Sequence, residues 1–132
     1  MSKVISDLKL MISGMEPVLN GGVYAYVSVP HGTDISMVAP VAMMSETEGT
    51  TLVIPEIQAI ENSFPILFRC AWITLNVHSD LNAFGLTAAF SKALAEDEIS
   101  CNVIAGAYHD HIFVPVELAN KSMSALKRLQ TA

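Results

Sequence analysis

The chain has 132 residues, of which 52% are hydrophobic and 15% charged, with a formal net charge of −6, and this size predicts one compact domain or two very small halves. The acidic balance and the scattered lysines and arginines exclude the basic stripe of a nucleic-acid-binding protein, and no apolar run is long enough to span a membrane. With no signal-peptide pattern at the N-terminus, we expect a cytoplasmic protein, and the high apolar share predicts a subunit interface or a sheet buried on both faces.

The first half of the chain predicts a helix, three strands and a second helix. The first helix runs from Ser2, a capping residue, to Gly14. Its buried face is the row of Val4, Leu8, Met11 and Ile12. Residues 21–30, "GGVYAYVSVP", predict a strand ended by proline, and residues 40–55 predict two strands around a turn at Glu46 to Gly49. Residues 56–62 then predict two helical turns.

The second half has a clearer β-α-β-β-α pattern. Residues 68–78 predict a strand, a helix follows Gly85, residues 100–115 predict a hairpin that turns at His109-Asp110, and the last helix begins after Pro115. One face of the strand is an apolar row of Ala71, Ile73, Leu75 and Val77, and the other is a mixed row of Phe68, Cys70, Trp72, Thr74, Asn76 and His78. We expect the apolar row to face helices and the mixed row to face another sheet, a second subunit or a ligand.

The order of these elements predicts an α+β fold with ferredoxin-like βαββα units, in which helices cover one face of antiparallel sheets. The second unit lacks a fourth strand, and the first half is also incomplete. An uncovered sheet edge must be covered by something else. We therefore expect an N-terminal half (1–65) and a C-terminal half (66–132) that complete each other, with the strand at 68–78 serving both.

The stretch "AWITLNVHSDLNAFGLTAAFSKALAEDEISCNVIAGAYHDHIFVP" (71–115) resembles the ACT domain family, in particular small bacterial proteins built from two ACT-like halves. "GGVYAYVSV" and "SETEGTTLVIP" resemble the N-terminal half of the same group. The resemblance implies regulatory binding of small molecules, most often amino acids, at the first strand-to-helix loop. It also implies pairing of ACT units within the chain and between chains. With no catalytic domain attached, it implies a free-standing sensor or accessory subunit.

The polar loop after the strand at 68–78 is the candidate ligand site. Backbone N–H groups at a helix start lack internal partners and favour an anion, and Gly85 allows close approach. We expect a ligand carboxylate on the amides of Gly85 to Thr87 and its ammonium group on Asp80, Asn82 or Asn76. The simpler interpretation is that Asn82 caps the helix and Asp80 forms an Asx turn. The predicted ligand-binding residues are Asn76, Ser79, Asp80, Asn82, Phe84, Gly85, Leu86 and Thr87.

Other titratable groups predict no metal, cofactor or catalytic centre. Some ACT relatives carry an acidic residue where the second hairpin strand begins, but residues 108–111 read Tyr-His-Asp-His, which argues against a cationic ligand such as arginine. A turn at Asp110 also separates the two histidines that could have shared a metal. Cys70 and Cys101 lie in apolar runs and are expected to be reduced, buried thiols. Glu46 and Glu48 predict a solvated turn.

The sequence is compatible with two functions. The first is a non-enzymatic, amino-acid-binding regulatory module of ACT type, acting as a homodimer. The alternative is a structural protein–protein interaction module with no ligand, which docks a partner through the face that carries Phe68, Cys70 and Trp72. The two differ in whether a cavity lies near Gly85.

Overall fold

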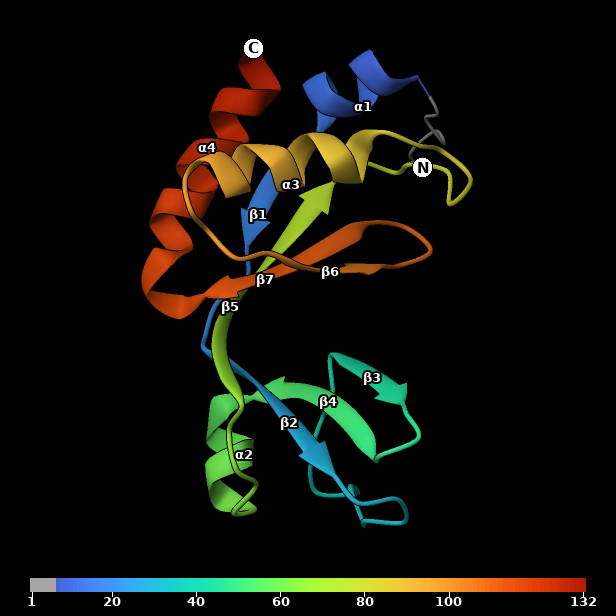
Figure 1. Ribbon diagram of the computed structural model, residues 1–132, viewed down its shortest axis with the longest axis vertical. Coiled ribbons are helices and arrows are strands. Elements are labelled where there is room, and N and C mark those ends of the chain that lie inside the picture. Colours follow the sequence, from blue (N-terminus) through green and yellow to red (C-terminus); the bar gives the residue numbers. More distant parts are fainter. Residues whose placement is uncertain (1–6) are drawn as a thin grey trace.

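The computed structural model describes residues 7–132, which form two lobes joined by one long strand (Figure 1). In chain order the elements are α1 (Leu8–Gly14), β1 (Glu16–Leu19), β2 (Tyr24–Val29), β3 (Ala42–Ser45), β4 (Thr50–Pro55), α2 (Glu56–Glu61), β5 (Phe68–Asn76), α3 (Leu86–Glu96), β6 (Asn102–Ala105), β7 (Asp110–Pro115), a 3-10 turn η1 (Val116–Leu118) and α4 (Ala119–Thr131). The predicted start of the first helix, at Ser2 and Val4, lies outside the described residues. Asp7 caps α1, and its side chain accepts a hydrogen bond from the Leu10 amide.

One antiparallel sheet runs through both lobes, in the order β3-β4-β2-β5-β7-β6, and β1 adds to it beside β5. The first part of β5, from Phe68 to Cys70, pairs with β2. Its later part, up to Asn76, lies between β7 on one side and β1 on the other. The predicted α+β ferredoxin-like fold and the sharing of this strand between the two halves are therefore confirmed.

β1 supplies the strand that the second half lacks, and the sequence did not predict it. Glu16–Leu19 is only four residues long and contains Pro17, which reads as a break between elements. Proline is tolerated here because β1 is an edge strand whose described pairing is with β5 alone, from Glu16 opposite Asn76 to Leu19 opposite Ile73.

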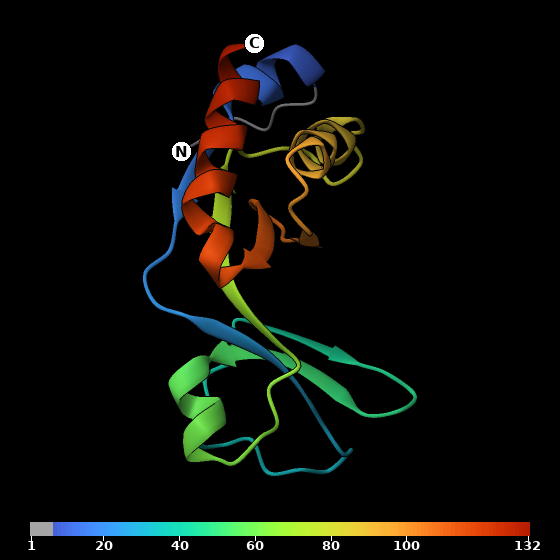
Figure 2. The ribbon, with the colours of Figure 1, turned by 60° about the vertical axis from the view of Figure 1, so that its left-hand side comes forward.

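The apolar row of β5 lies in the core of the upper lobe, as predicted. Ala71, Ile73, Leu75 and Val77 are all buried there, together with residues of α1, α3 and α4. Figure 2 shows α4 alongside β5, with α1 and α3 gathered at the same end of the molecule. The periodicity of α3 explains its part in this core, because its buried residues, Leu86, Phe90 and Leu94, recur every four positions.

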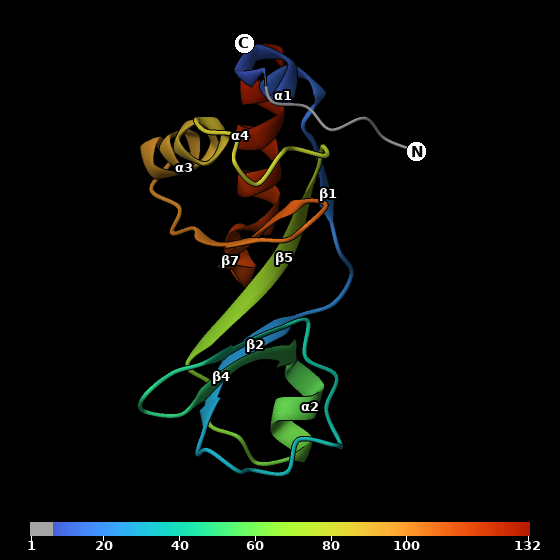
Figure 3. The same cartoon turned by 90° about the vertical axis from the view of Figure 1, so that its right-hand side faces the viewer.

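The lower lobe is smaller and has a single helix. β2 and β4 bury Ala25, Val27, Leu52 and Ile54 against α2 and against the loops that precede β3 and follow α2. Residues 30–41, between β2 and β3, form no helix, although the first crossover of a ferredoxin-like unit is normally helical. Figure 3 shows this segment as a loop around the lower end of the molecule.

The first three residues of the mixed row of β5, Phe68, Cys70 and Trp72, face the other half, which is one of the three alternatives expected for this row. Cys70, Val53 and Phe113 form a buried cluster between the lobes. Aromatic rings surround it: the Trp72 ring stacks on Phe113 with centroids 6.4 Å apart, and Tyr26 meets Phe113 edge-on at 5.7 Å.

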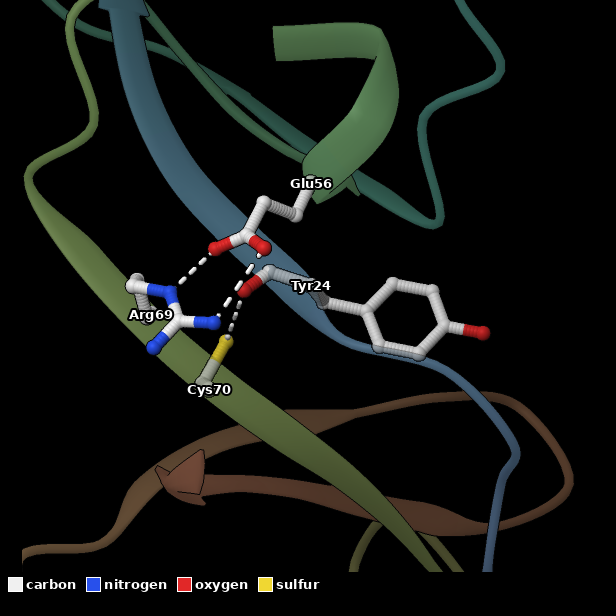
Figure 4. Close-up of polar contacts among 4 residues, drawn as sticks. All are labelled: Tyr24, Glu56, Arg69 and Cys70. Atoms are coloured by element: carbon white, nitrogen blue, oxygen red, sulfur yellow. Dashed lines mark hydrogen bonds and ion pairs between the residues drawn. The ribbon is translucent and has the colours of Figure 1, made fainter. Parts of the chain in front are cut away.

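An ion pair ties α2 to β5 (Figure 4). The Arg69 guanidinium binds Glu56 through Nε–Oε2 and through Nη2–Oε1, the latter at 3.2 Å. The next residue along β5 is Cys70, and its thiol donates a hydrogen bond to the Tyr24 carbonyl oxygen at 3.5 Å. The hydrogen bond from Arg69 lowers the pKa of Glu56 from its ordinary value of 4.5.

This ion pair predicts a specific acid sensitivity. Because the Glu56 pKa is lower in the folded state, its stabilising contribution is present above 4.5 and is lost as the pH falls through the folded-state pKa. We expect Glu56→Gln to lose less stability than the wild type between neutral pH and about pH 3. Urea midpoints at both pH values measure this difference. Glu61→Gln, exposed on the same helix, is the control and should follow the wild type.

Candidate functional site

The loop between β5 and α3 folds through a series of short backbone turns. The Asp80 carboxylate accepts a hydrogen bond from the Asn82 amide at 2.9 Å, and the Asp80 carbonyl accepts one from the Ala83 amide at 2.9 Å. The Asx turn predicted at Asp80 is thus confirmed. Asn82 does not cap α3, however, and that prediction is wrong: the capping position is Gly85, in the left-handed region at φ 102°.

Gly85 has two consequences for the start of α3. A glycine has no side chain to cap the helix, so no side-chain hydrogen bond from the capping position reaches the first-turn amides. A Cβ at Gly85 would lie 3.0 Å from Leu8 Cδ2, so a larger residue would be both strained and crowded. The start of α3 therefore combines uncapped N–H donors with a backbone that the Leu8 side chain approaches closely.

A cavity of about 240 Å³ lies beside this loop. Six of the eight residues predicted for the ligand site line it: Ser79, Asp80, Phe84, Gly85, Leu86 and Thr87. The other two do not. Asn76 lies exposed at the end of β5, opposite Glu16, and Asn82 is exposed on the loop. Leu81 and Ala83 of the same loop, Met11 of α1, and Ala105 and Asp110 of the β6–β7 hairpin complete the wall.

Asp110 is the site residue that the sequence placed incorrectly. The hairpin turns at residues 106–109, where the Gly106 amide donates to the His109 carbonyl at 2.9 Å, and not at His109-Asp110. Asp110 is the first residue of β7, opposite Ala105 and Leu75. An acidic residue thus stands where the second hairpin strand begins, which removes the argument against a cationic ligand. Burial raises the pKa of this carboxyl group.

The neighbouring histidines have different surroundings. His111 Nδ1 accepts the Trp72 indole N–H at 3.0 Å and lies 3.2 Å from Thr74 Oγ1, on the sheet face that joins the lobes. His109 lies in the hairpin turn. Within residues 7–132, no three histidine, cysteine or carboxylate side chains are grouped as a metal site.

The two cysteines and the two glutamates of the β3–β4 turn lie outside the cavity. Cys70 is buried and Cys101 half-buried, both are free thiols, and burial raises their pKa values to about 12 and about 11. Glu46 and Glu48 are exposed at the β3–β4 turn, as predicted.

The face named for partner docking is covered by the protein itself. Cys70 is fully buried, and Phe68 and Trp72 pack on the cluster between the lobes. These side chains therefore serve the contact between the halves. In the part of the chain that the structure describes, no helix combines the length and apolarity needed to cross a bilayer.

Two ACT domain models match the sequence, one over residues 3–71 and the other over residues 67–128. The chain belongs to the ACT domain family. Together with the fold, this membership defines it as a regulatory module of the ligand-binding class.

The chain is similar to a protein of unknown function from Vibrio cholerae, with 41% identity over 93% of this chain and 95% of that one and a TM-score of 0.83. It shares its fold with the ligand-free regulatory subunit of aspartate kinase from Thermus thermophilus, at 8% identity, 88% and 97% coverage and a TM-score of 0.66. The same holds for aspartokinase III of Escherichia coli in complex with aspartate and ADP, at 13% identity, 88% and 33% coverage and a TM-score of 0.64. No protein of curated function matches in sequence.

Proposed function

We propose that the protein is a non-catalytic regulatory module that binds an amino acid in the cavity between the β5–α3 loop and the start of β7. The observation that carries the proposal is the meeting of uncapped α3 amides with two carboxylates, Asp80 and Asp110, around one cavity. Its volume of about 240 Å³ lies below the roughly 300–1,000 Å³ of sites for drug-sized ligands, so it suits a ligand as small as an amino acid.

The chemistry of the residues that line the cavity supports a zwitterionic ligand. The ligand carboxylate binds at the N-terminus of α3, where the helix dipole and the amides following Gly85 favour negative charge. The ligand ammonium group, or a cationic side chain, binds Asp110, whose partly buried carboxylate gains more from a charged partner than an exposed one would. Ser79 and Thr87 offer hydroxyl groups at the same wall.

We further propose that the module acts in the cytoplasm as a homodimer of chains that each contain two ACT-like halves, 1–65 and 66–132. Two large side chains beside the cavity, Leu81 and Phe84, are exposed, and such residues gain from burial by a second chain. The two ends of the main sheet order, β3 and β6, each carry one described strand partner. Ligand binding then favours one arrangement of the dimer, which is the regulatory signal.

Thermal unfolding in the presence of each of the twenty amino acids, at millimolar concentration, tests the proposal. A ligand at a hundred times its Kd adds about 2.7 kcal/mol to the free energy of unfolding, which raises the midpoint by several degrees. We expect one amino acid, or a chemically related group, to raise the midpoint. A flat panel contradicts the amino-acid proposal.

Substitutions at the cavity test whether the ligand binds there. Gly85→Val sets a side chain against Leu8 at the strained start of α3, which should displace the first-turn amides and abolish the shift, whereas Gly22→Val introduces similar backbone strain at φ 94° in open space and should keep it. Asp110→Asn keeps the shape of the side chain and removes its charge, so it should weaken binding about tenfold or more. An unchanged shift in both Gly85→Val and Asp110→Asn would move the ligand away from this cavity.

A further inference from the structure

A second concavity lies between the β3–β4 and β6–β7 hairpins, which project to the same side of the molecule in Figure 1. Its volume is about 450 Å³, within the range of small-molecule sites. The residues around it are paired across the strands, Tyr26 opposite Val53, Val53 opposite Ala42, and Ile104 opposite His111. Directly opposed residues present their side chains on one face, so this groove lies on the inner sheet face that joins the lobes.

The wall of the groove carries no formal charge. Val41, Met44, Val53 and Ile104 supply apolar surface, and the two titratable lining residues are Tyr26 and His111. Burial raises the pKa of Tyr26 to about 12, and burial and the neighbouring His109 lower the pKa of His111. Both side chains are therefore neutral at pH 7. A charged ligand would lose its hydration here without gaining an opposite charge.

His111 gives this apolar groove one directed polar group. The Trp72 N–H can only donate, so His111 Nδ1 accepts it and the ring proton of the neutral imidazole resides on Nε2. Nε2 lies beside Gly106, where a Cβ would be only 3.3 Å away, and Gly106 itself lines the groove. Because Gly106 has no side chain to fill this position, and both described hydrogen bonds of the His111 ring are made by Nδ1, we take the Nε2–H group to be available to an acceptor in the groove.

We propose that this groove is a second ligand site, which takes an uncharged, largely apolar small molecule that carries a hydrogen-bond acceptor such as a carbonyl oxygen. The apolar body of the ligand packs on Met44, Val53 and Ile104, and its acceptor binds His111 Nε2. The flexible thioether of Met44 adapts to the shape of the ligand. The site is separate from the amino-acid cavity, because Asp110 and His111 are consecutive residues of β7 and point to opposite faces of the sheet.

The probe for this site is Prodan, a neutral naphthalene ketone whose fluorescence shifts to the blue in apolar surroundings. We expect saturable binding of one Prodan per chain, with blue-shifted emission. Met44→Lys should weaken binding about tenfold or more, because it replaces an apolar contact with the ligand by a hydrated ammonium group at the groove wall. Met37→Lys is the matched control. Met37 is 77% exposed and Met44 is 63% exposed, but Met37 does not line the groove, so Met37→Lys should bind Prodan as the wild type does.

A second variant fills the groove without changing charge. Ala42→Phe should also remove Prodan binding, and circular dichroism together with the unfolding midpoint checks that it folds. The proposal is overturned if the wild type shows no saturable binding, or if folded Met44→Lys and Ala42→Phe bind like the wild type. It is also overturned if an amino acid that raises the midpoint displaces Prodan competitively, since the two sites would then be one.

Discussion

Phe90→Ala is expected to lower the free energy of unfolding by about 3–5 kcal/mol. Phe90 is 0% exposed in the middle of α3 and is among the largest fully buried side chains of the chain. It packs in the same core as Ile73 and Leu75 of β5, so truncation leaves a cavity that rigid neighbours cannot fill. Urea unfolding followed by far-UV circular dichroism gives the difference in free energy.

Phe84→Ala is the matched control, because it removes the same atoms from a side chain that is 88% exposed on the preceding loop. We expect its free energy of unfolding to lie within about 0.5 kcal/mol of the wild type. Equal losses in the two variants would mean that α3 does not pack through the face that the structure assigns to the core.

Ile54→Ala is expected to cost about 2–5 kcal/mol, and the loss should register at Trp72 in the other half of the chain. Ile54 is 0% exposed in the core of the lower lobe, on β4. β4 pairs with β2, and β2 pairs with β5, the strand that carries Trp72. Because both lobes contain β5, neither can lose its sheet without unpairing a strand of the other. Trp72 fluorescence and circular dichroism should therefore report one coincident urea transition.

The control for this variant is Ile57→Ala, at a side chain 59% exposed on α2, which should change the free energy of unfolding by no more than about 0.5 kcal/mol. Two separated transitions, with the Trp72 transition unmoved by Ile54→Ala, would contradict the coupling through β5.

The elements that the sequence predicted well are those whose signal is local. Strict alternation of apolar residues at positions 71–77 identified the core face of β5, and a four-residue apolar period identified α3. β1 was missed because nothing within Glu16–Leu19 indicates a strand: it forms because β5 offers a free edge. The turn was misplaced because Asp110 is a residue type that favours turns, whereas the hydrogen bond from the Gly106 amide to the His109 carbonyl places the turn at residues 106–109.

The cavity and the groove show the same difference between local sequence signals and contacts that form only in the fold. The six cavity residues that the sequence identified are nearly contiguous in the chain, so a strand-to-helix loop ending in glycine was a sufficient signal. Asp110 comes from another hairpin, and only the register of β7 brings it to the cavity. The groove between the hairpins had no sequence signal, since Met44, Ile104 and His111 meet only when β5 places the two lobes.

The pairing of β1 with β5 also constrains how the protein is made. Glu16 leaves the ribosome about 60 residues before its partner Asn76. At roughly 5–20 residues per second, β1 has no partner for about 3–12 seconds. During that interval Val18 and Leu19 of the nascent chain have no strand to pair with, so their backbone hydrogen-bonding groups stay open to pairing with other chains.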